Sequence, residues 1–384
     1  MQSVKTGDLK LGILGGGQLG KMLIEAASNW NIQCYVLDPD PECPCAQLAT
    51  HFTCGDFNDY DTVYAFGKLL PKLTIEIEHV NVEALRQLKA EGNEIFPDPD
   101  ILKIIQDKGK QKMFYEDNEL PTAYFQLLEN KKEIEALVQE GKINLPFVQK
   151  TCKAGYDGKG VQVIRSTGDL AHLLEGESVI EDLIEIETEI AVIVARDTHG
   201  NTRCFPPVSM EFHPTANLVE FLSAPANISH ENWKKAEDIA VRTIEAFQMV
   251  GVLAVEMFIT KDKEVLINEV APRPHNSGHH TIEANYTSQY EQLLRCIFHF
   301  PLGSTRMRSN AVMVNLLGEA GFSGNAVYSG LLQCLDKEGV YVHLYGKKNT
   351  KPFRKMGHVT VIHNNMDTAK EIAQFVKQQL KVIA

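Results

Sequence analysis

Two carboxylates on neighbouring predicted strands are the first residues that could do chemistry. Glu256 lies in the alternating run 252–259, and Glu269 lies in the run 265–270, which follows a short polar turn. Two apolar runs separated by such a turn predict an antiparallel hairpin, and side chains alternate across a strand. The pairing can therefore place both carboxylates on one face, with Asn268 beside the second. The alternative is two acids on a solvent-exposed sheet.

Two buried carboxylates side by side need a cation, because burying like charges together is very costly. Mg²⁺ prefers oxygen ligands and commonly takes one or two carboxylates together with nucleotide phosphates. Glu256 and Glu269 are therefore candidate magnesium ligands. The second strand ends at Ala271-Pro272-Arg273-Pro274, and the segment 275–280 that follows is rich in hydrogen-bonding side chains. Loops at strand ends usually build binding sites, so we expect this one to line the site.

A second candidate site is the segment 151–160, which joins the predicted strands 147–150 and 161–164. Backbone amides of a glycine-rich loop can point at phosphate oxygens, and Lys150 and Lys159 add positive charge. A hairpin turn needs only one glycine, but this segment has three: Gly155, Gly158 and Gly160. We interpret it as a phosphate-binding loop, with a plain hairpin turn as the alternative.

A third candidate site opens the chain. The apolar strand 9–14 runs into Gly15-Gly16-Gly17-Gln18-Leu19-Gly20, a helical pattern covers 21–29, and the strand 32–37 ends at Asp38. This βαβ pattern with G-x-G-x-x-G in its first turn is typical of dinucleotide-binding domains. Such a turn binds phosphates of many kinds, because free amides at a helix N-terminus attract anions. An NAD-dependent dehydrogenase is therefore one reading.

The remaining pattern alternates helices and strands, as in an α/β protein. It predicts a strand over 73–80 with Glu76 and Glu78, one long helical segment over 100–118, and a strand over 178–184. An amphipathic helix is expected over 232–249, just before the hairpin. Beyond Pro301 the expected elements are strands over 311–317, 340–344 and 358–361 and a helix over 367–380.

Length and composition restrict the class of protein. The 384 residues predict two to three domains, and 44% apolar with 23% charged residues is a globular composition. A net charge of −12 argues against nonspecific binding to nucleic acid or anionic membranes. No apolar run reaches the length of a membrane span, and the N-terminus lacks the pattern of a signal peptide. We therefore expect a cytoplasmic protein.

The eight cysteines are scattered, and Cys43 and Cys45 form the only close pair. One pair lacks the second half of a zinc site. We interpret these two residues as reduced thiols in a reducing compartment.

The glycine loop between strands, the Glu…Asn-Glu pair on a later hairpin and the N-terminal βαβ half together resemble the ATP-grasp superfamily. A finer signature resembles the 5-(carboxyamino)imidazole ribonucleotide synthase family of de novo purine (IMP) biosynthesis, over nearly the whole chain. It consists of GGGQLG, DPDPECPCAQLA, TIEIE, DKGKQK, AGYDGKG, INEVAPRPHNSGHHTIEA and RKMGH, in this order. Two residues depart from it: Ala154 and His79 stand where the family more often has glycine and asparagine.

The resemblance implies an ATP-grasp fold with four segments. They are an N-terminal Rossmann-like pre-ATP-grasp domain (1–105), a small lid domain (106–185), a domain with the metal site (186–305) and a C-terminal β-rich extension (306–384). It also implies a homodimer and an ATP-dependent carbon–nitrogen ligase. ATP phosphorylates bicarbonate to carboxyphosphate, which releases CO₂ beside the amine of 5-aminoimidazole ribonucleotide. The amine is carboxylated, leaving ADP and phosphate.

By the same resemblance, Mg²⁺ is held by Glu256 and Glu269 with help from Asn268, while lysines contact the ATP phosphates. The stretch 181–184 is expected at the adenine and Glu189 at the ribose; the alternative is a solvated acidic stretch. The full expected ATP-binding set is Lys108, Lys150, Gly155, Tyr156, Asp157, Gly158, Lys159, Gly160, Glu181, Asp182, Leu183, Ile184, Glu189, Asn268 and Glu269.

The ribonucleotide site implied by the resemblance draws on both ends of the chain. Its expected residues are Gly17, Gln18, Leu19, Glu76, Glu78, His275, Asn276, Ser277, Arg354 and Lys355. Arg273 is the candidate for binding bicarbonate and carboxyphosphate, because a guanidinium stays charged and cannot act as a base. Asp157 is the candidate base, and Lys355 completes the catalytic set. The alternatives are an ordinary Asp-Gly turn at 157 and a basic surface turn at 354–355.

Three other functions remain open at this point. Another ATP-grasp carboxylase, such as biotin carboxylase, or a formate-dependent ribonucleotide ligase would share the ATP site and differ in the acceptor site. A dehydrogenase would use the first glycine turn but would leave the second glycine loop and the paired acids without a role. A non-catalytic nucleotide-binding protein would lack magnesium-dependent turnover.

Overall fold

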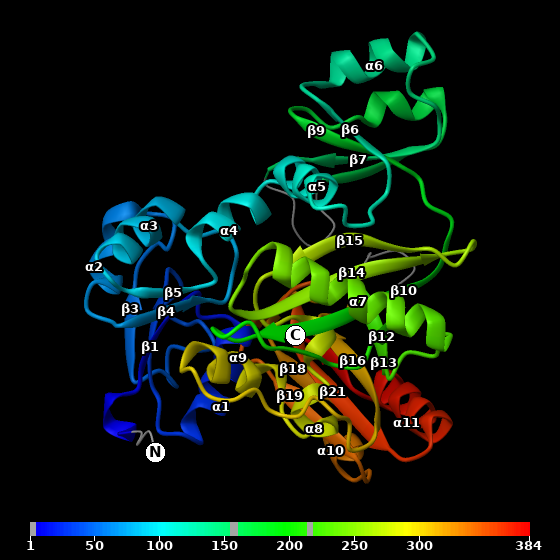
Figure 1. Cartoon of the computed structure of the whole chain (residues 1–384). Helices are drawn as coiled ribbons and strands as arrows, with labels where there is room; N and C mark the ends of the chain where they lie inside the picture. Colours follow the sequence, from blue (N-terminus) through cyan, green and yellow to red (C-terminus); the bar gives the residue numbers. More distant parts are fainter. Residues whose placement is uncertain (1–4, 154–159, 213–217) are drawn as a thin grey trace.

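The computed structural model describes residues 5–153, 160–212 and 218–384, and it confirms the α/β class (Figure 1). Among these residues, helices alternate with strands that form one parallel sheet, one small antiparallel sheet, one large antiparallel sheet and two short strand pairs. Within the same described ranges, no helix combines the length and apolar character that crossing a bilayer requires.

The N-terminal part is a parallel sheet with strand order β3-β2-β1-β4-β5. Its strands are almost continuously apolar, as expected when helices cover both faces. Side chains at helix starts, such as Asp59 and Asn81, accept backbone N–H bonds and fix where those helices begin. The strands are β1 (Lys10–Leu14), β2 (Gln33–Asp38), β3 (His51–Cys54), β4 (Lys72–Ile75) and β5 (Glu94–Phe96); the helices are η1 (Thr6–Asp8), α1 (Gln18–Ser28), α2 (Tyr60–Gly67), α3 (Val82–Ala90) and α4 (Pro99–Ile105).

The small sheet stands above the rest of the molecule in Figure 1 and has the order β6-β9-β7-β8. Its own apolar core includes Phe147, Ile164 and Ile180. The strands are β6 (Phe125–Leu128), β7 (Phe147–Thr151), β8 (Val161–Ile164) and β9 (Ser178–Asp182), and the helices are α5 (Lys108–Asp117), α6 (Lys131–Gln139) and η2 (Thr167–His172).

The large sheet runs β15-β14-β10-β12-β13-β16-β21-β19, with β11 added beside β10. The C-terminal strands therefore continue the sheet that begins with the hairpin, as an extension of it. Its strands are β10 (Ile186–Arg196), β11 (Thr202–Cys204), β12 (Val208–Phe212), β13 (Val219–Ala224), β14 (Gly251–Thr260), β15 (Val265–Ala271), β16 (Asn310–Leu317), β19 (Val340–Leu344) and β21 (Lys355–His363).

Helices cover this sheet and join it to the N-terminal part. Helix α7 (His230–Ala246) packs on β10 and β14, α11 (Met366–Gln379) packs on β16 and β21, and α9 (Gln289–Ile297) contacts both β14 and α1. The shorter elements are η3 (Asn276–Gly278), α8 (Thr281–Ala284), α10 (Leu331–Leu335), and the pairs β17 (Gly324–Asn325) with β20 (Asn349–Thr350) and β18 (Val327–Ser329) with β22 (Lys381–Ile383).

Two of the predicted elements are wrong in extent. The strand expected over 73–80 ends at Ile75, because the chain bends away once it passes the edge of the sheet, and Gln106 holds the carbonyls of Glu78 and Val80. The long helical segment over 100–118 is two helices. The break is at Asp107, whose side chain accepts the N–H groups of Gly109 and Lys110 and so starts α5 anew. The division into domains at 105, 185 and 305 remains a prediction.

Candidate active site

The predicted hairpin is confirmed, and its two acids lie directly opposite each other. Glu256 on β14 pairs in register with Glu269 on β15, just before a β-bulge. Ala191 of β10 lies opposite Glu256 on the other side. Side chains two residues apart share a face of a strand, so Glu189 joins the same face. Three carboxylates from three adjacent strands thus lie on one face, and the space over this face is called the cleft below.

This crowding of acids has a clear electrostatic effect. Burial, then the negative charges of Glu269 and Glu189, raises the pKa of Glu256 to about 8. Burial also raises the pKa of Glu189 to about 7, although the charge of Lys150 opposes this shift. A further cation, in addition to Lys150, would favour the ionised forms of Glu256 and Glu189, since opposite charge stabilises a carboxylate.

Glu269 already has such a cation. The Nζ atom of Lys108, the first residue of α5, lies 2.7 Å from its Oε2 atom. The positive charge of Lys108 holds the pKa of Glu269 down at about 2, even though burial opposes this. Burial alone would lower the pKa of the Lys108 ammonium, but the acids around it outweigh burial and raise that pKa. The Glu269 side chain is 46% exposed, so the pair lines an open cleft rather than a sealed core.

Lys150, on β7 of the small sheet, reaches the same place from the other side. Its ammonium donates to Asn268 Oδ1 at 2.8 Å and lies 2.9 Å from Glu181 Oε2. Lys112 lies 3.0 Å from the other oxygen of Glu181. Only 5% of the Glu181 side chain is exposed, and it is enclosed between the two ammonium groups. Its carboxylate therefore positions lysines; any contact of Glu181 with adenine must come from its backbone.

The residues after Glu181 form the connection between β9 and β10. The amide of Asp182 donates to the carbonyl of Tyr124 at 3.1 Å, and the Asp182 side chain is exposed. Leu183 and Ile184 are half-buried. The stretch 181–184 therefore lies where the chain passes from β9 of the small sheet to β10 of the large one, and β10 carries Glu189.

The hairpin site suits a magnesium ion that also binds phosphate oxygens. Within the described ranges, no group of three or more His, Cys, Asp or Glu side chains has the geometry to hold a metal alone. Mg²⁺ does not need one, since one or two carboxylates and nucleotide phosphates commonly suffice. Glu256 and Glu269 provide that pair, with the Asn268 carbonyl oxygen beside them. Burial and the charges of Glu269 and Glu189 raise the pKa of Glu256 despite the opposing charges of Lys355 and Lys108, and a divalent cation at this face would favour its ionised form.

The loop after β15 connects this face to a second half of the cleft. His275 Nε2 lies 3.4 Å from Glu256 Oε1, and His275 Nδ1 lies 2.9 Å from Ser277 Oγ. Asn276 exchanges two amide hydrogen bonds with Asn315 of β16, at 2.8 and 2.9 Å. Gln289 accepts from the His275 amide and donates to its carbonyl. The loop is therefore held rigidly, and only His275 among these side chains reaches the acids.

Arg273 and Glu78 meet across the cleft. Arg273 Nη2 lies 2.8 Å from Glu78 Oε1, and both side chains are less than one-fifth exposed. The end of the hairpin thus touches the bend that follows β4. A guanidinium at this position is fixed in orientation and presents a permanent positive charge to the cleft.

The first glycine turn is closed by carboxylates of the protein itself. Gly16 donates to Asp38 Oδ2 at 2.6 Å, and Leu19 donates to Glu76 Oε1 at 3.2 Å. A Cβ atom on Gly17 would lie 2.3 Å from Glu76 Oε1, so a larger residue there would displace the Glu76 carboxylate. Burial raises the pKa of Glu76 to about 7, against the lowering effect of the nearby Arg273 charge. Gly17 and the half-buried Gln18 remain at the rim of the turn.

Cys43 and Cys45 pack against this turn. Cys45 Sγ contacts the Gly17 carbonyl at 3.4 Å, and a Cβ atom on Gly16 would lie 2.4 Å from Cys43 Sγ. Both thiols are buried and reduced, as expected from the sequence. Burial raises the pKa of the Cys43 thiol to about 11, which leaves it protonated.

The basic residues expected at the C-terminal end take different positions. Lys355 starts β21, and its positive charge acts on Glu256, lowering the pKa of that carboxyl. Lys347 donates to the Lys355 carbonyl at 2.8 Å. Arg354 instead donates to the carbonyl of Asn349 at 2.6 Å, on an exposed turn. The charge of Lys355 thus acts on the acids of the cleft, whereas Arg354 lies at the margin of the cleft.

Five residues of the expected site, Gly155, Tyr156, Asp157, Gly158 and Lys159, lie outside the described residues, as does Ala154. Gly160 is described. Its φ of +78° is a conformation that favours glycine, and its carbonyl accepts from the Thr151 amide at 2.9 Å.

Lys112, Gln289 and Asn315 were not identified from the sequence. Lys112 follows Lys108 by four residues on α5, and this helical spacing was the only sequence signal available. The other two act through contacts between distant segments.

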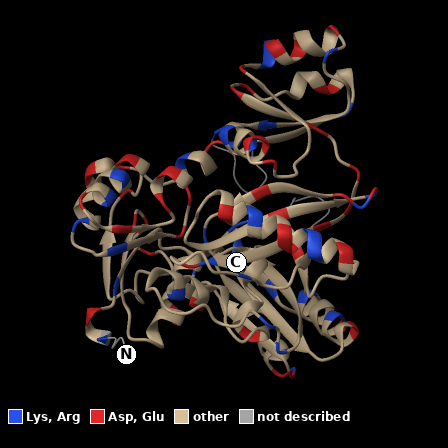
Figure 2. Ribbon diagram, in the orientation of Figure 1, with Lys and Arg blue, Asp and Glu red and all other residues tan. Residues whose placement is uncertain are grey.

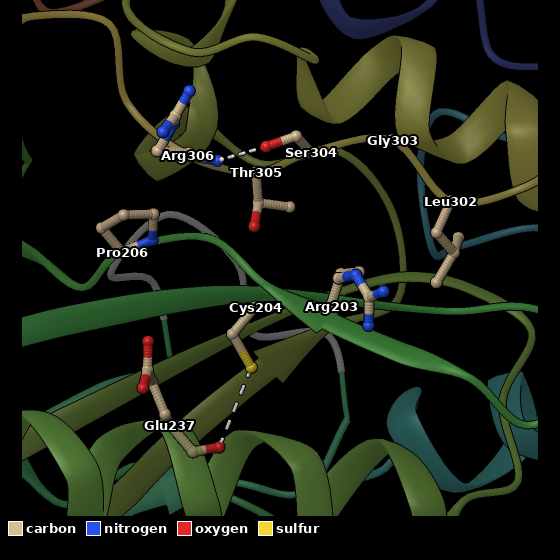
Figure 3. Close-up of a pocket in the computed structure, with 9 residues that line it drawn as sticks. All are labelled: Arg203, Cys204, Pro206, Glu237, Leu302, Gly303, Ser304, Thr305 and Arg306. Carbon is tan, nitrogen blue, oxygen red and sulfur yellow. Dashed lines mark hydrogen bonds between the residues drawn. The ribbon is translucent and has the colours of Figure 1, made fainter.

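A separate hollow of about 560 Å³ lies beside β11 and α7 (Figure 3). Its nine lining residues include Arg203, Glu237 and Arg306, and none of them belongs to the cleft described above. The side chains drawn in Figure 3 spread around the hollow rather than converge on one point.

Comparison with known families covers most of the chain. Residues 9–106 match the ribonucleotide synthetase preATP-grasp domain, residues 113–290 match the ATP-grasp domain, and residues 311–372 match the phosphoribosylaminoimidazole carboxylase C-terminal domain.

Two curated relatives match at full or partial length. The N5-carboxyaminoimidazole ribonucleotide synthase of Bacillus subtilis is 36% identical, covering 93% of this chain and 92% of the relative. The chloroplastic phosphoribosylaminoimidazole carboxylase of Vigna aconitifolia is 35% identical over 94% of this chain, which spans 65% of that longer protein.

Two solved structures share the fold. N5-carboxyaminoimidazole ribonucleotide synthetase from Thermotoga maritima is 42% identical, with a TM-score of 0.90 over 98% of this chain and 99% of the other. The Aspergillus clavatus N5-carboxyaminoimidazole synthase, solved with ADP and 5-aminoimidazole ribonucleotide, is 30% identical, with a TM-score of 0.88 over 97% and 99%. The ATP-grasp fold expected from the sequence motifs is confirmed. The chain belongs to the N5-carboxyaminoimidazole ribonucleotide synthase family of ATP-grasp enzymes.

Proposed function

We propose that the chain is an ADP-forming carbon–nitrogen ligase that carboxylates the amine of 5-aminoimidazole ribonucleotide, using ATP and bicarbonate. The observation that carries this proposal is the contact between two half-sites. His275 joins the loop 275–277 to Glu256, and Arg273 joins the hairpin to Glu78. A nucleotide half and an acceptor half thus share one cleft. The relative solved with both ADP and 5-aminoimidazole ribonucleotide supports the same pairing of ligands.

Phosphoryl transfer would take place over the hairpin. Glu256 and Glu269 would hold Mg²⁺, which when bound supplies positive charge to the phosphate oxygens in the transition state. Lys108 would then leave Glu269 for a phosphate oxygen, because the same carboxylate favours the closer divalent ion. Lys150 would stay oriented by Asn268 and Glu181, both within 2.9 Å of its ammonium. The stretch 181–184 would hold the adenine, and Glu189 the ribose.

The loop 155–160, of which only Gly160 is among the described residues, is proposed to close over the phosphates with its glycine amides and Lys159. Its closure would exclude water from carboxyphosphate, an intermediate that water would otherwise destroy. Arg273, fixed by Glu78, would bind bicarbonate and then carboxyphosphate through its permanent charge.

The amine of the ribonucleotide would then take up the released CO₂ and lose a proton. Asp157 is the proposed base, and Lys355 completes the proposed catalytic set. Gly17, Gln18 and the loop 275–277 would hold the ribose and phosphate, with Glu76 and Glu78 below them. Arg354, on its exposed turn, would contact the phosphate only from the margin of the cleft.

A cytoplasmic location, expected from the sequence patterns, and a homodimer, which rests on the family alone, complete the proposal. The dehydrogenase reading is not supported by the geometry of the first turn. Asp38, which would have to reach a ribose hydroxyl, is instead bonded to the amides of Gly16 and Asp40, at 2.6 and 2.8 Å.

The test is ADP release from magnesium-ATP in bicarbonate buffer, measured with and without 5-aminoimidazole ribonucleotide. A strong increase on adding the ribonucleotide is expected. Release that ignores this compound but responds to another amine or to formate would keep the nucleotide half and reject the proposed acceptor.

A further inference from the structure

Three histidines from three separate segments stack on one another beside the cleft. The ring centroids of His279 and His358 lie 4.6 Å apart, and those of His358 and His343 lie 4.4 Å apart with an angle of 7° between the rings. His279 and His358 are 1% and 0% exposed. The family signature in the sequence includes two of these histidines, but no role for them followed from it.

Each ring of this histidine column has a fixed partner. Tyr290 Oη lies 3.0 Å from His279 Nδ1, Tyr345 Oη lies 3.1 Å from His358 Nδ1, and Glu283 Oε1 lies 2.7 Å from His343 Nε2. Each contact holds one nitrogen of its ring, so a ring cannot turn without losing that hydrogen bond. The column is therefore a rigid connection and not a loose packing of side chains.

The column joins the loop of the acceptor half to the strand that carries Lys355. His279 directly follows the loop 275–278, and His358 lies three residues after Lys355 on β21. In the sheet, His358 has two neighbours in register, His343 on β19 and Asn315 on β16.

Asn315 makes a second connection between the same two parts. It exchanges two hydrogen bonds with Asn276, while its neighbour His358 stacks on His279. Two points of attachment fix both the position and the direction of the short loop between them. A single attachment would leave the loop free to pivot.

The rings must be uncharged for this stack to hold. Burial, then the positive charges nearby, keeps the pKa of His279 and of His358 well below the usual range. The groups that face them are His275, His280, His343 and Lys355, together with the tyrosines and Glu283 named above. A proton on His279 would face His275, His280, His343 and Lys355. A proton on His358 would face His279, His280 and His343.

We propose that the stacked imidazoles of His279, His358 and His343 are positioning residues that fix the loop 275–277 against the start of β21, and thereby set the affinity for the ribonucleotide. The inference rests on the proposed function, because it names the ligand of that function. The ring contacts described above involve none of Lys108, Lys150 and Glu269, so the affinity for magnesium-ADP should depend on the rings far less than the affinity for the ribonucleotide does.

The experiment compares two substitutions of one ring. His358→Phe keeps an uncharged aromatic ring in the column, whereas His358→Leu removes the ring at similar volume. The dissociation constants of 5-aminoimidazole ribonucleotide and of magnesium-ADP are measured by calorimetry on the full chain, alongside the melting temperature. The matched control is His363→Leu, which removes an exposed histidine from the same strand.

We expect His358→Leu to weaken ribonucleotide binding on the order of tenfold while leaving magnesium-ADP binding within about twofold, since small displacements of binding groups have effects of this size. His358→Phe should recover most of the loss, and His363→Leu should match the wild type. If His358→Leu does not fold, His343→Leu, at the more exposed end of the column, should give about a threefold loss for the ribonucleotide alone.

Two results would overturn the inference, and they differ. If the wild type binds the ribonucleotide and the Leu variants bind it equally well, or lose both ligands alike, the column is only core packing. If the wild type binds no ribonucleotide at all, the proposed function fails and the assignment of the column fails with it.

Discussion

The two halves of the proposed site are held together by different kinds of contact, charged in one and mainly neutral in the other. The proposed nucleotide half is a set of charges: Lys108 on Glu269, Lys150 on Asn268 and Glu181, and Lys112 on Glu181. Figure 2 shows charged residues on both the hairpin and the small sheet that faces it. In the proposed acceptor half the ion pair of Arg273 with Glu78 stands at one end, but the loop 275–277 itself is held by neutral contacts, namely the Asn276–Asn315 amide pair and the histidine column.

This difference indicates how each half meets its ligand. A network of charges can exchange partners when magnesium-ATP arrives, because each lysine can move from a carboxylate to a phosphate at little cost in charge. A neutral, hydrogen-bonded frame cannot exchange partners without leaving buried polar groups unsatisfied. We therefore expect the nucleotide half to rearrange on binding and the acceptor half to be already in place.

The largest test of this comparison is Glu269→Gln. It removes the carboxylate that both Lys108 and the proposed magnesium ion use, so kcat should fall by roughly 10²- to 10³-fold. Steady-state ADP release at saturating ligands measures the effect. Glu264→Gln, at the exposed end of the same hairpin, is the control and should stay near wild type. Equal activity of both variants would remove Glu269 from the site.

The next test separates the two chemical steps. Asp157→Asn should reduce carboxylation by about 10²-fold, the usual contribution of a general base, while ADP formation is less damaged. The measurement is the ratio of carboxylated ribonucleotide to ADP in the same reaction. A ratio that stays at the wild-type value would mean that Asp157 is not the base.

Glu181→Ala tests how much the charge network contributes to the stability of the protein. It leaves two buried ammonium groups without their shared carboxylate, so the free energy of unfolding should fall by about 3 kcal/mol. Urea denaturation measures this. The control is Glu187→Ala, which breaks the exposed pair with Lys263 and should cost less than about 1 kcal/mol. Similar losses in both variants would show that the buried pairs stabilise the protein no more than the exposed pair does.

The two halves should also respond to pH in opposite directions. Glu256 has a folded-state pKa raised from 4.5 to about 8, so its contribution to stability is lost as the pH rises through that range. His279 and His358 have lowered pKa values, so their contribution is lost as the pH falls below about 6.5.

Melting temperatures of the ligand-free protein across this pH range test the point. Glu256→Gln should flatten the alkaline side and His358→Phe the acidic side, each by a few degrees. Magnesium-ADP should stabilise the wild type more at pH 8 than at pH 6, because the metal needs the ionised carboxylate. Parallel pH profiles in all three proteins would contradict the division into a charged and a neutral half.

The sequence predicted the features that depend on local signals and missed those that do not. The hairpin with its opposed acids was predictable, because alternation and a short turn are local signals that fix which side chains share a face. The break at Asp107 was missed, since an Asp inside a helical pattern does not reveal that its side chain will cap a new helix. The early end of β4 was missed because a strand pattern does not show where the sheet ends.

Contacts between distant segments were beyond the sequence. The stacking of His279 on His358 joins residues from two motifs that were each visible, but nothing local connects them. Likewise, the amide of Leu19 was predicted to bind the ribonucleotide, and only the fold shows that it already donates to Glu76.

The most direct test of the central claim, that one cleft joins phosphoryl transfer to carboxylation, is the fate of oxygen in labelled bicarbonate. With bicarbonate labelled by oxygen-18, carboxyphosphate formation must leave one labelled oxygen in the released phosphate and label in the carboxyl group of the product. We predict label in both, appearing together. Carboxylated product with unlabelled phosphate would show that bicarbonate is never phosphorylated, and would contradict the account.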